Sequence, residues 1–125
     1  MIDHLSINCS DWAKSQEFYD KVLHVLGYSR QMEFGPAVGY GRDRPSFWIA
    51  DASAGGVDGP NREVHIAFAA RSPEEVQAFY HEALALGAEP LHAPRLWPEY
   101  HENYYGAFVR DPDGNNVEAV FHGGA

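Results

Sequence analysis

Three residues of types that bind metal ions, His4, His65 and Glu118, lie at related places in the sequence. His4 and His65 begin two similar segments, HLSINCSDWAKSQEFYDKVLHVLG and HIAFAARSPEEVQAFYHEALALGA. Glu118 lies in the strand-like stretch NVEAVF, directly after the turn-forming RDPDGN. Burying a carboxylate is costly unless it is paired, hydrogen-bonded or bound to a metal. Two imidazoles and one carboxylate suit Fe(II), Mn(II) and related ions, and they leave other positions on the ion open for substrate.

The strands expected to carry these residues place them on one face of a sheet. Side chains alternate between the two faces of a strand. His4, His65 and Glu118 then point away from the helices, and they converge if the two halves of the chain curl together. Taken singly, a histidine on a strand is more often a hydrogen-bonded packing residue, and a glutamate there is more often exposed to solvent. The equivalent positions of the two histidines favour the metal site over these alternatives.

The two similar segments predict two structural units of the same kind. Each begins with a strand, over 2–9 and 63–70, and continues with a helix, over 11–26 and 73–87. Asp11 and Ser72 are expected to cap the helices, with Glu75 completing a capping box, and Gly27 and Gly87 to end them. Short strands should follow the helices over 28–34, 36–41 and 45–50 in the first unit, and over 88–92, 104–110 and 116–122 in the second.

The expected fold class is therefore α+β, with two tandem βαβββ units. The units cover about 1–50 and 63–125, and the Gly-rich segment 51–62 links them. Because neither half is large enough to bury a core alone, we expect one domain over residues 1–125.

Composition excludes several classes of partner. The chain has 125 residues, and its formal net charge of −9 opposes binding to nucleic acids or anionic membranes. No apolar run approaches the ~20 residues that span a bilayer, and the N-terminal sequence lacks the pattern of a signal peptide. Cys9 is the only cysteine, so no intrachain disulfide forms. A cytoplasmic location is the natural expectation.

Four stretches together resemble the vicinal oxygen chelate superfamily: IDHLSINCSD, FYDKVLHVLGY, VHIAFAA and YYGAFVRDPDGNNVEAV. That group includes glyoxalase I, extradiol dioxygenases, fosfomycin-resistance thiol transferases and bleomycin-resistance proteins. The resemblance implies a cupped mixed sheet with helices outside, and a divalent metal ion (Fe, Mn, Ni, Co or Zn) held by His4, His65 and Glu118. It also implies a small-molecule substrate that chelates the ion through oxygen atoms, and a homodimer.

A fourth position of the family's metal site falls on Trp48, which cannot bind a metal. The three-ligand members, thiol transferases and extradiol dioxygenases, therefore fit better than glyoxalase I. Trp48 either contacts a substrate or is a plain packing residue. The predicted function is a metal-dependent lyase, isomerase, thiol transferase or dioxygenase. The alternative is a metal-free binding protein of the bleomycin-resistance type.

The segment HAPRLWPEYHENYY, residues 92–105, looks like an insertion before a strand that should line the site. Loops of this length in compact domains often cover binding sites. Within it His101, Tyr104 and Tyr105 are candidate acid–base or hydrogen-bonding groups, and Arg95 and Trp97 are candidate substrate contacts. The alternative is an exposed loop whose aromatic side chains pack on its own surface or on a dimer partner.

Overall fold

The computed structural model describes residues 3–53 and 64–123. The predicted linker 51–62 lies largely outside the described residues. Neither described helix is long and apolar enough to cross a membrane. The elements follow the predicted order, and the two helices are α1 (Trp12–Val25) and α2 (Pro73–Ala85). The strands are β1 (Leu5–Cys9), β2 (Ser29–Phe34), β3 (Ala37–Gly41), β4 (Phe47–Asp51), β5 (His65–Ala69), β6 (Pro90–Leu96), β7 (Tyr105–Arg110) and β8 (Asn116–Phe121).

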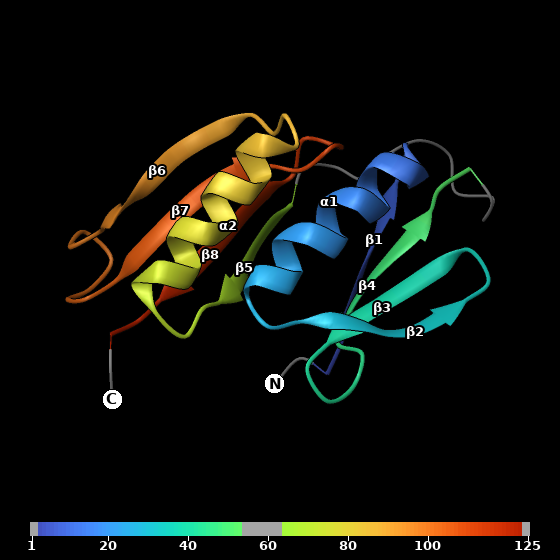
Figure 1. Cartoon of the computed structure of the whole chain (residues 1–125), viewed down its shortest axis with the longest axis horizontal. Helices are drawn as coiled ribbons and strands as arrows, with labels where there is room; N and C mark the ends of the chain where they lie inside the picture. The colour runs from blue at the N-terminus through green and yellow to red at the C-terminus, as the bar shows by residue number, and fades with distance from the viewer. Residues whose placement is uncertain (1–2, 54–63, 124–125) are drawn as a thin grey trace.

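Each unit forms its own mixed four-stranded sheet. The strand orders are β1-β4-β3-β2 and β5-β8-β7-β6. The first strand of each unit pairs in parallel with the last, and the other neighbours are antiparallel. The sheets lie side by side, and both helices cover the same side of them (Figure 1). The predicted α+β fold with tandem units is confirmed, with two sheets in place of one continuous sheet.

A shared core joins the two units. The Phe47 ring, from β4, lies 5.0 Å from Tyr19 of α1 and 5.0 Å from Phe68 of β5. The helices α1 and α2 also contact each other. Cys9 is fully buried in this core, and burial raises the pKa of its thiol to about 12, so the thiol is unreactive at neutral pH.

Helix boundaries follow the predicted signals with one difference. Asp11 accepts a hydrogen bond from the Lys14 backbone N–H at 3.1 Å, and Ser72 accepts one from Glu75 N–H at 3.1 Å. The predicted capping box closes one residue early, because Glu75 Oε1 accepts from the backbone N–H of Arg71 at 2.8 Å and not from that of Ser72. Gly27 and Gly87 follow the ends of α1 and α2 and adopt positive φ angles of 87° and 85°, which glycine tolerates.

Removing the α2 cap should have a measurable cost. Replacing Ser72 with Ala is expected to lower the free energy of unfolding by about 1 kcal/mol, since one backbone N–H loses its acceptor. Chemical denaturation of the variant beside an exposed-serine control, Ser6→Ala, checks this. Equal midpoints for the two variants would contradict the capping role.

The segment 92–105 departs from its prediction as a loop. Strand β6 continues to Leu96, so only residues 97–104 form the connection to β7. The pairing of β6 with β7 shifts register between Pro90 and His92 and again between His92 and Arg95. Because β6 is an edge strand, it tolerates prolines, whose missing N–H groups need no partner there.

Candidate functional site

The Glu118 carboxylate is buried in the second unit. Its side chain is only 1% exposed. Of the two alternatives that the sequence offers for Glu118 on β8, a solvent-exposed residue and a metal ligand, the burial contradicts the first. His65 Nε2 lies 3.0 Å from Glu118 Oε1, and the Tyr104 hydroxyl donates a hydrogen bond to Oε2. Both carboxylate oxygens therefore have a partner, which offsets the cost of burying the charge.

Strand pairing positions these groups. In the parallel pair β5–β8, Ala67 lies opposite Glu118, and the His65 side chain projects from the same face two residues earlier. Gly106 of β7 leaves the space that the carboxylate needs. A Cβ at this position would lie 3.1 Å from Glu118 Oε2 and 3.3 Å from Tyr104 Cε1.

Tyr104 acts as a hydrogen-bond donor in this arrangement. Burial, and then the hydrogen bond to the Glu118 carboxylate, raise the pKa of Tyr104 well above its ordinary value. The hydroxyl therefore stays protonated at neutral pH and fixes the orientation of one carboxylate oxygen.

A cavity of about 330 Å³ opens beside Glu118. Trp97 supports its wall from behind: Trp97 Nε1 donates to the Gly106 carbonyl at 3.0 Å, and its ring packs edge-on against Phe108 at 5.2 Å. The cavity thus combines one buried carboxylate with largely aromatic walls, which is a suitable composition for a small-molecule site. Its lining residues are His65, His92, Tyr100, Tyr104, Phe108, Asn116 and Glu118.

His4 lies in a different cavity, on the first unit. That cavity, of about 540 Å³, also contains Trp48 and Phe34. His4 Nδ1 lies 2.9 Å from Asp3 Oδ1. The other oxygen of that carboxylate, Oδ2, accepts a hydrogen bond from Arg44 Nη1, also at 2.9 Å. Within residues 3–53 and 64–123, no group of three or more His, Cys, Asp or Glu side chains could hold a metal ion.

The three predicted ligands therefore do not converge within one chain. The physical reason is the side-by-side arrangement of two separate sheets, with His4 next to β1 of one sheet and Glu118 on β8 of the other (Figure 1). His65 and Glu118 form a half-site, and His4 stands apart from it.

The remaining predicted residues divide between the cavity and its surroundings. Tyr105 points to the helix side, where its hydroxyl accepts a hydrogen bond from Gln77 of α2 at 3.0 Å, so it is not in the site. His101 pairs with His122 and does not line the cavity. The Arg95 guanidinium lies 3.4 Å from the centre of the Trp97 ring and pairs with Glu99.

Four lining residues were missed by the sequence analysis: His92, Tyr100, Phe108 and Asn116. For Asn116 a signal exists, because it lies two residues before Glu118 on the same strand and so shares its face. His92 and Phe108 pack edge-on, with ring centroids 5.5 Å apart, across the β6–β7 pair, a contact that depends on the shifted register.

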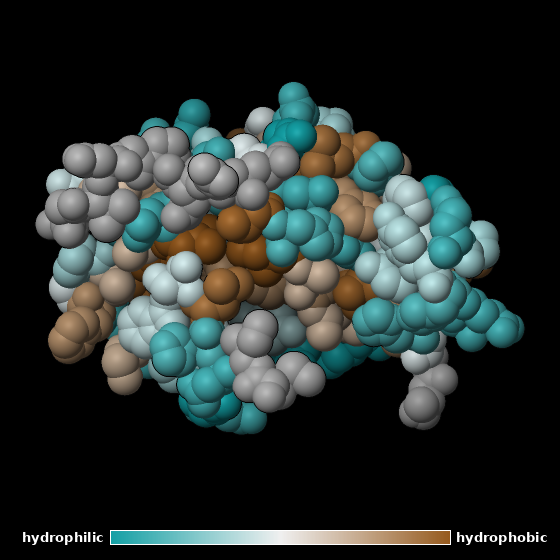
Figure 2. Space-filling view, turned by 180° about the vertical axis from the view of Figure 1, so that it is seen from behind, coloured by the Kyte–Doolittle hydropathy of each residue, from teal (hydrophilic) through white to brown (hydrophobic). Residues whose placement is uncertain are grey.

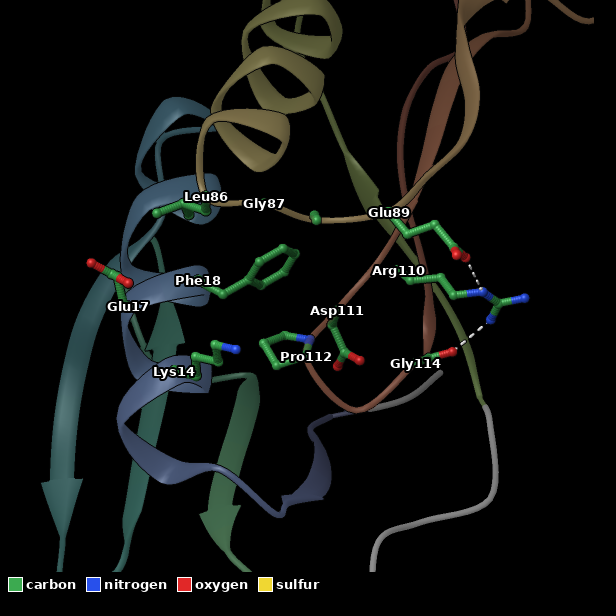
Figure 3. A pocket seen from close by; sticks show the side chains of 11 residues that line it. Lys14, Glu17, Phe18, Leu86, Gly87, Glu89, Arg110, Asp111, Pro112 and Gly114 are labelled. Atoms are coloured by element: carbon green, nitrogen blue, oxygen red, sulfur yellow. Dashed lines mark hydrogen bonds and ion pairs between the residues drawn. The ribbon is translucent and has the colours of Figure 1, made fainter.

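Another cavity, also of about 330 Å³, lies between the two units on the helix side (Figure 3). Two of its charged side chains pair with each other: Arg110 donates to Glu89 at 3.0 Å, and also to the Gly114 carbonyl at 2.6 Å. The Asp111 carboxylate, at its edge, accepts from the Tyr19 hydroxyl at 2.7 Å. Of these contacts, the hydrogen bond between Tyr19 and Asp111 joins the two units. The cavity contains none of the predicted site residues.

The chain is similar to several known proteins over almost its whole length. It is 27% identical to a glyoxalase/bleomycin resistance protein from Albidiferax ferrireducens T118, with a TM-score of 0.81 and coverage of 97% of this chain and 98% of that one. A lactoylglutathione lyase from Agrobacterium tumefaciens is 22% identical, with a TM-score of 0.68 and coverage of 97% and 92%, which shows the fold alone.

One sequence relative is the uncharacterized protein YqjT of Bacillus subtilis (strain 168). It is 25% identical over 122 residues, which make up 94% of this chain and 95% of the relative. The sequence model of the Glyoxalase/Bleomycin resistance protein/Dioxygenase superfamily matches residues 1–119, which include His4, His65 and Glu118. The tandem βαβββ fold and this match together place the chain in the Glyoxalase/Bleomycin resistance protein/Dioxygenase superfamily.

Proposed function

We propose that this protein is a divalent-metal-dependent enzyme acting on a small oxygen-bearing substrate. Its metal centre uses His65 and Glu118 of one copy of the chain and His4 of a second copy. The observation that carries the proposal is Glu118, a carboxylate only 1% exposed that forms the floor of a small-molecule cavity beside an imidazole nitrogen.

The half-site fits a metal ion in its donor types and in its spacing. Imidazole nitrogen and carboxylate oxygen are ligands for Fe, Mn, Ni, Co and Zn. Two donors bound to one ion through bonds of about 2.1 Å at a right angle lie roughly 3 Å apart. His65 Nε2 and Glu118 Oε1 are separated by 3.0 Å.

A second copy would supply the missing histidine. The face opposite the helices gathers apolar side chains near its centre (Figure 2). Phe34, 73% exposed, lines the cavity of His4, and Tyr100, 57% exposed, lines the cavity of Glu118. A two-fold dimer that covers both cavities brings each His4 to the other chain's Glu118, and it buries these apolar side chains as well.

The ion, when bound, supplies Lewis-acid polarisation of a substrate oxygen. The chain's own residues orient the ligands, exclude water and contact the substrate. The Tyr104 hydroxyl holds Glu118 Oε2 in place, the aromatic walls exclude water, and Trp48, beside His4, provides a flat apolar surface for the substrate.

A metal-free binding protein is the second candidate, and one observation favours it. Both oxygens of Glu118 already have hydrogen-bond partners without any ion. In that case Glu118 would stabilise the pocket, and small molecules would bind between its aromatic walls.

Replacing Glu118 with Gln separates the two candidates. Loss of a residue that only hydrogen-bonds a metal ligand typically lowers metal affinity by about 10–100-fold. Because Glu118→Gln removes a charged ligand itself, we expect metal affinity to fall at least as much. Titration with Mn(II), followed by calorimetry and thermal melting, measures this. The parent should gain roughly 2.7 kcal/mol of apparent stability at an ion concentration 100 times the dissociation constant.

The control is Glu99→Gln, which removes an exposed carboxylate paired with Arg95. It should leave metal affinity unchanged. If Glu118→Gln instead keeps the parent's affinity and melts at a higher temperature, the metal centre is wrong and the binding protein is the better description.

A further inference from the structure

A pair of histidines lies outside the Glu118 cavity, at the end of the segment 97–104. His101 Nε2 and His122 Nδ1 are 2.9 Å apart, and the two rings stack with centroids 5.1 Å apart and planes 20° apart. Both side chains are exposed. His101 belongs to the segment that carries Tyr100 and Tyr104, whereas His122 directly follows β8.

The hydrogen bonds fix which nitrogens are available for binding. His101 Nδ1 lies 2.6 Å from the Glu102 carbonyl oxygen, which can only accept, so Nδ1 carries a hydrogen and donates it. In the neutral ring the lone pair is then on Nε2, which faces His122. An imidazole that donates one ring N–H to a carbonyl while the other nitrogen stays free is the usual state of a metal-binding histidine.

We propose that His101 and His122 form a second metal site, which binds a late first-row divalent cation, Cu(II), Ni(II) or Zn(II). Their 2.9 Å separation matches the roughly 3 Å expected for neighbouring donors on one ion. When the ion binds, the hydrogen shared by the two nitrogens moves to Nε2 of His122, the other neutral tautomer, and water completes the coordination. Cu(II) binds most tightly, following the general order of affinity for nitrogen ligands.

The site joins the segment 97–104 to the end of β8. The Tyr104 ring contacts both imidazoles, with its centroid 5.2 Å from that of His101 and 5.3 Å from that of His122. The Tyr104 hydroxyl donates a hydrogen bond to Glu118. An ion bound by the pair therefore fixes the aromatic wall over the Glu118 cavity. The inference does not depend on a metal at Glu118, because the two donor sets share no residue.

The test uses the Glu118→Gln protein, in which the proposed catalytic centre is removed. Cu(II) titration followed by calorimetry and electron paramagnetic resonance should show one ion per chain with imidazole nitrogen hyperfine structure. Adding His101→Gln or His122→Asn should weaken binding at least tenfold, and combining both should cost little more, since either change breaks the pair. His24→Gln and His81→Gln, on exposed turns of α1 and α2, should leave affinity unchanged.

A second readout tests the effect on the segment 97–104. At an ion concentration 100 times the dissociation constant, hydrogen exchange of its amides should slow about a hundredfold if opening breaks the site. Absence of Cu(II) binding to the Glu118→Gln protein, or equal binding after His101→Gln, would overturn the proposal. A protein with only the Glu118 centre would show the reverse pattern, losing its ion with Glu118→Gln and keeping it with His101→Gln.

Discussion

Chains with His4→Ala and chains with Glu118→Gln should each lose the catalytic metal centre, and mixing them should restore about a quarter of the sites of the parent. In a mixed dimer both substitutions fall in the same site, because His4 of one copy meets Glu118 of the other. The remaining site of that dimer then has all three parental ligands. With random pairing, half of the dimers are mixed, and each has one intact site of two.

The measurement is bound Mn(II) per chain after the two variants are unfolded together, refolded and separated from free ion. Mixing His65→Ala with Glu118→Gln is the matched control. Those two substitutions lie in the same half-site, 3.0 Å apart in the parent, so every site of their mixed dimers is damaged. Recovery in the control, or none in the test mixture when mixed dimers are present, would rule out a centre shared between copies.

The repeat in the sequence explains how much of the fold could be predicted. Strand alternation and helix caps are local properties. The side of the sheet to which Glu118 points, and the residues at which α2 begins and ends, therefore follow from the neighbouring sequence. The relation between the units is not local. It depends on the contact of α1 with α2 and on the rings of Tyr19, Phe47 and Phe68, which are far apart in the chain. The separation of His4 from Glu118 therefore could not be predicted from alternation.

Two adjacent tyrosines illustrate the same limit within the site. Tyr104 and Tyr105 were equivalent candidates in the sequence, but successive residues point to opposite faces of a strand. The structure directs Tyr104 to Glu118 and Tyr105 to Gln77 of α2. Choosing between them requires the register of β7, and the irregular pairing of β6 with β7 hides that register from sequence patterns.

The largest effect on stability is expected at Asp111, which is 5% exposed at the junction of the two units. Its carboxylate accepts hydrogen bonds from the Tyr19 hydroxyl at 2.7 Å, from Asn115 Nδ2 at 2.9 Å, and from the backbone N–H groups of Asp113 and Asn115. Burial, and then the Asp111 carboxylate, raise the pKa of Tyr19 well above its ordinary value, so the hydroxyl remains a donor.

Replacing Asp111 with Ala should lower the free energy of unfolding by about 3–5 kcal/mol, since several buried donors lose their acceptor at once. For a chain of this size the melting temperature should fall by roughly 10–20 °C. Asp113→Ala is the control: among the described residues its carboxylate accepts hydrogen bonds from the exposed Ser10 of the first unit, through the backbone N–H at 3.0 Å and the hydroxyl, so its cost should be about 1 kcal/mol. Equal melting temperatures for the two variants would show that the buried Asp111 contributes no more to the junction of the units than the exposed contact of Asp113 with Ser10 does.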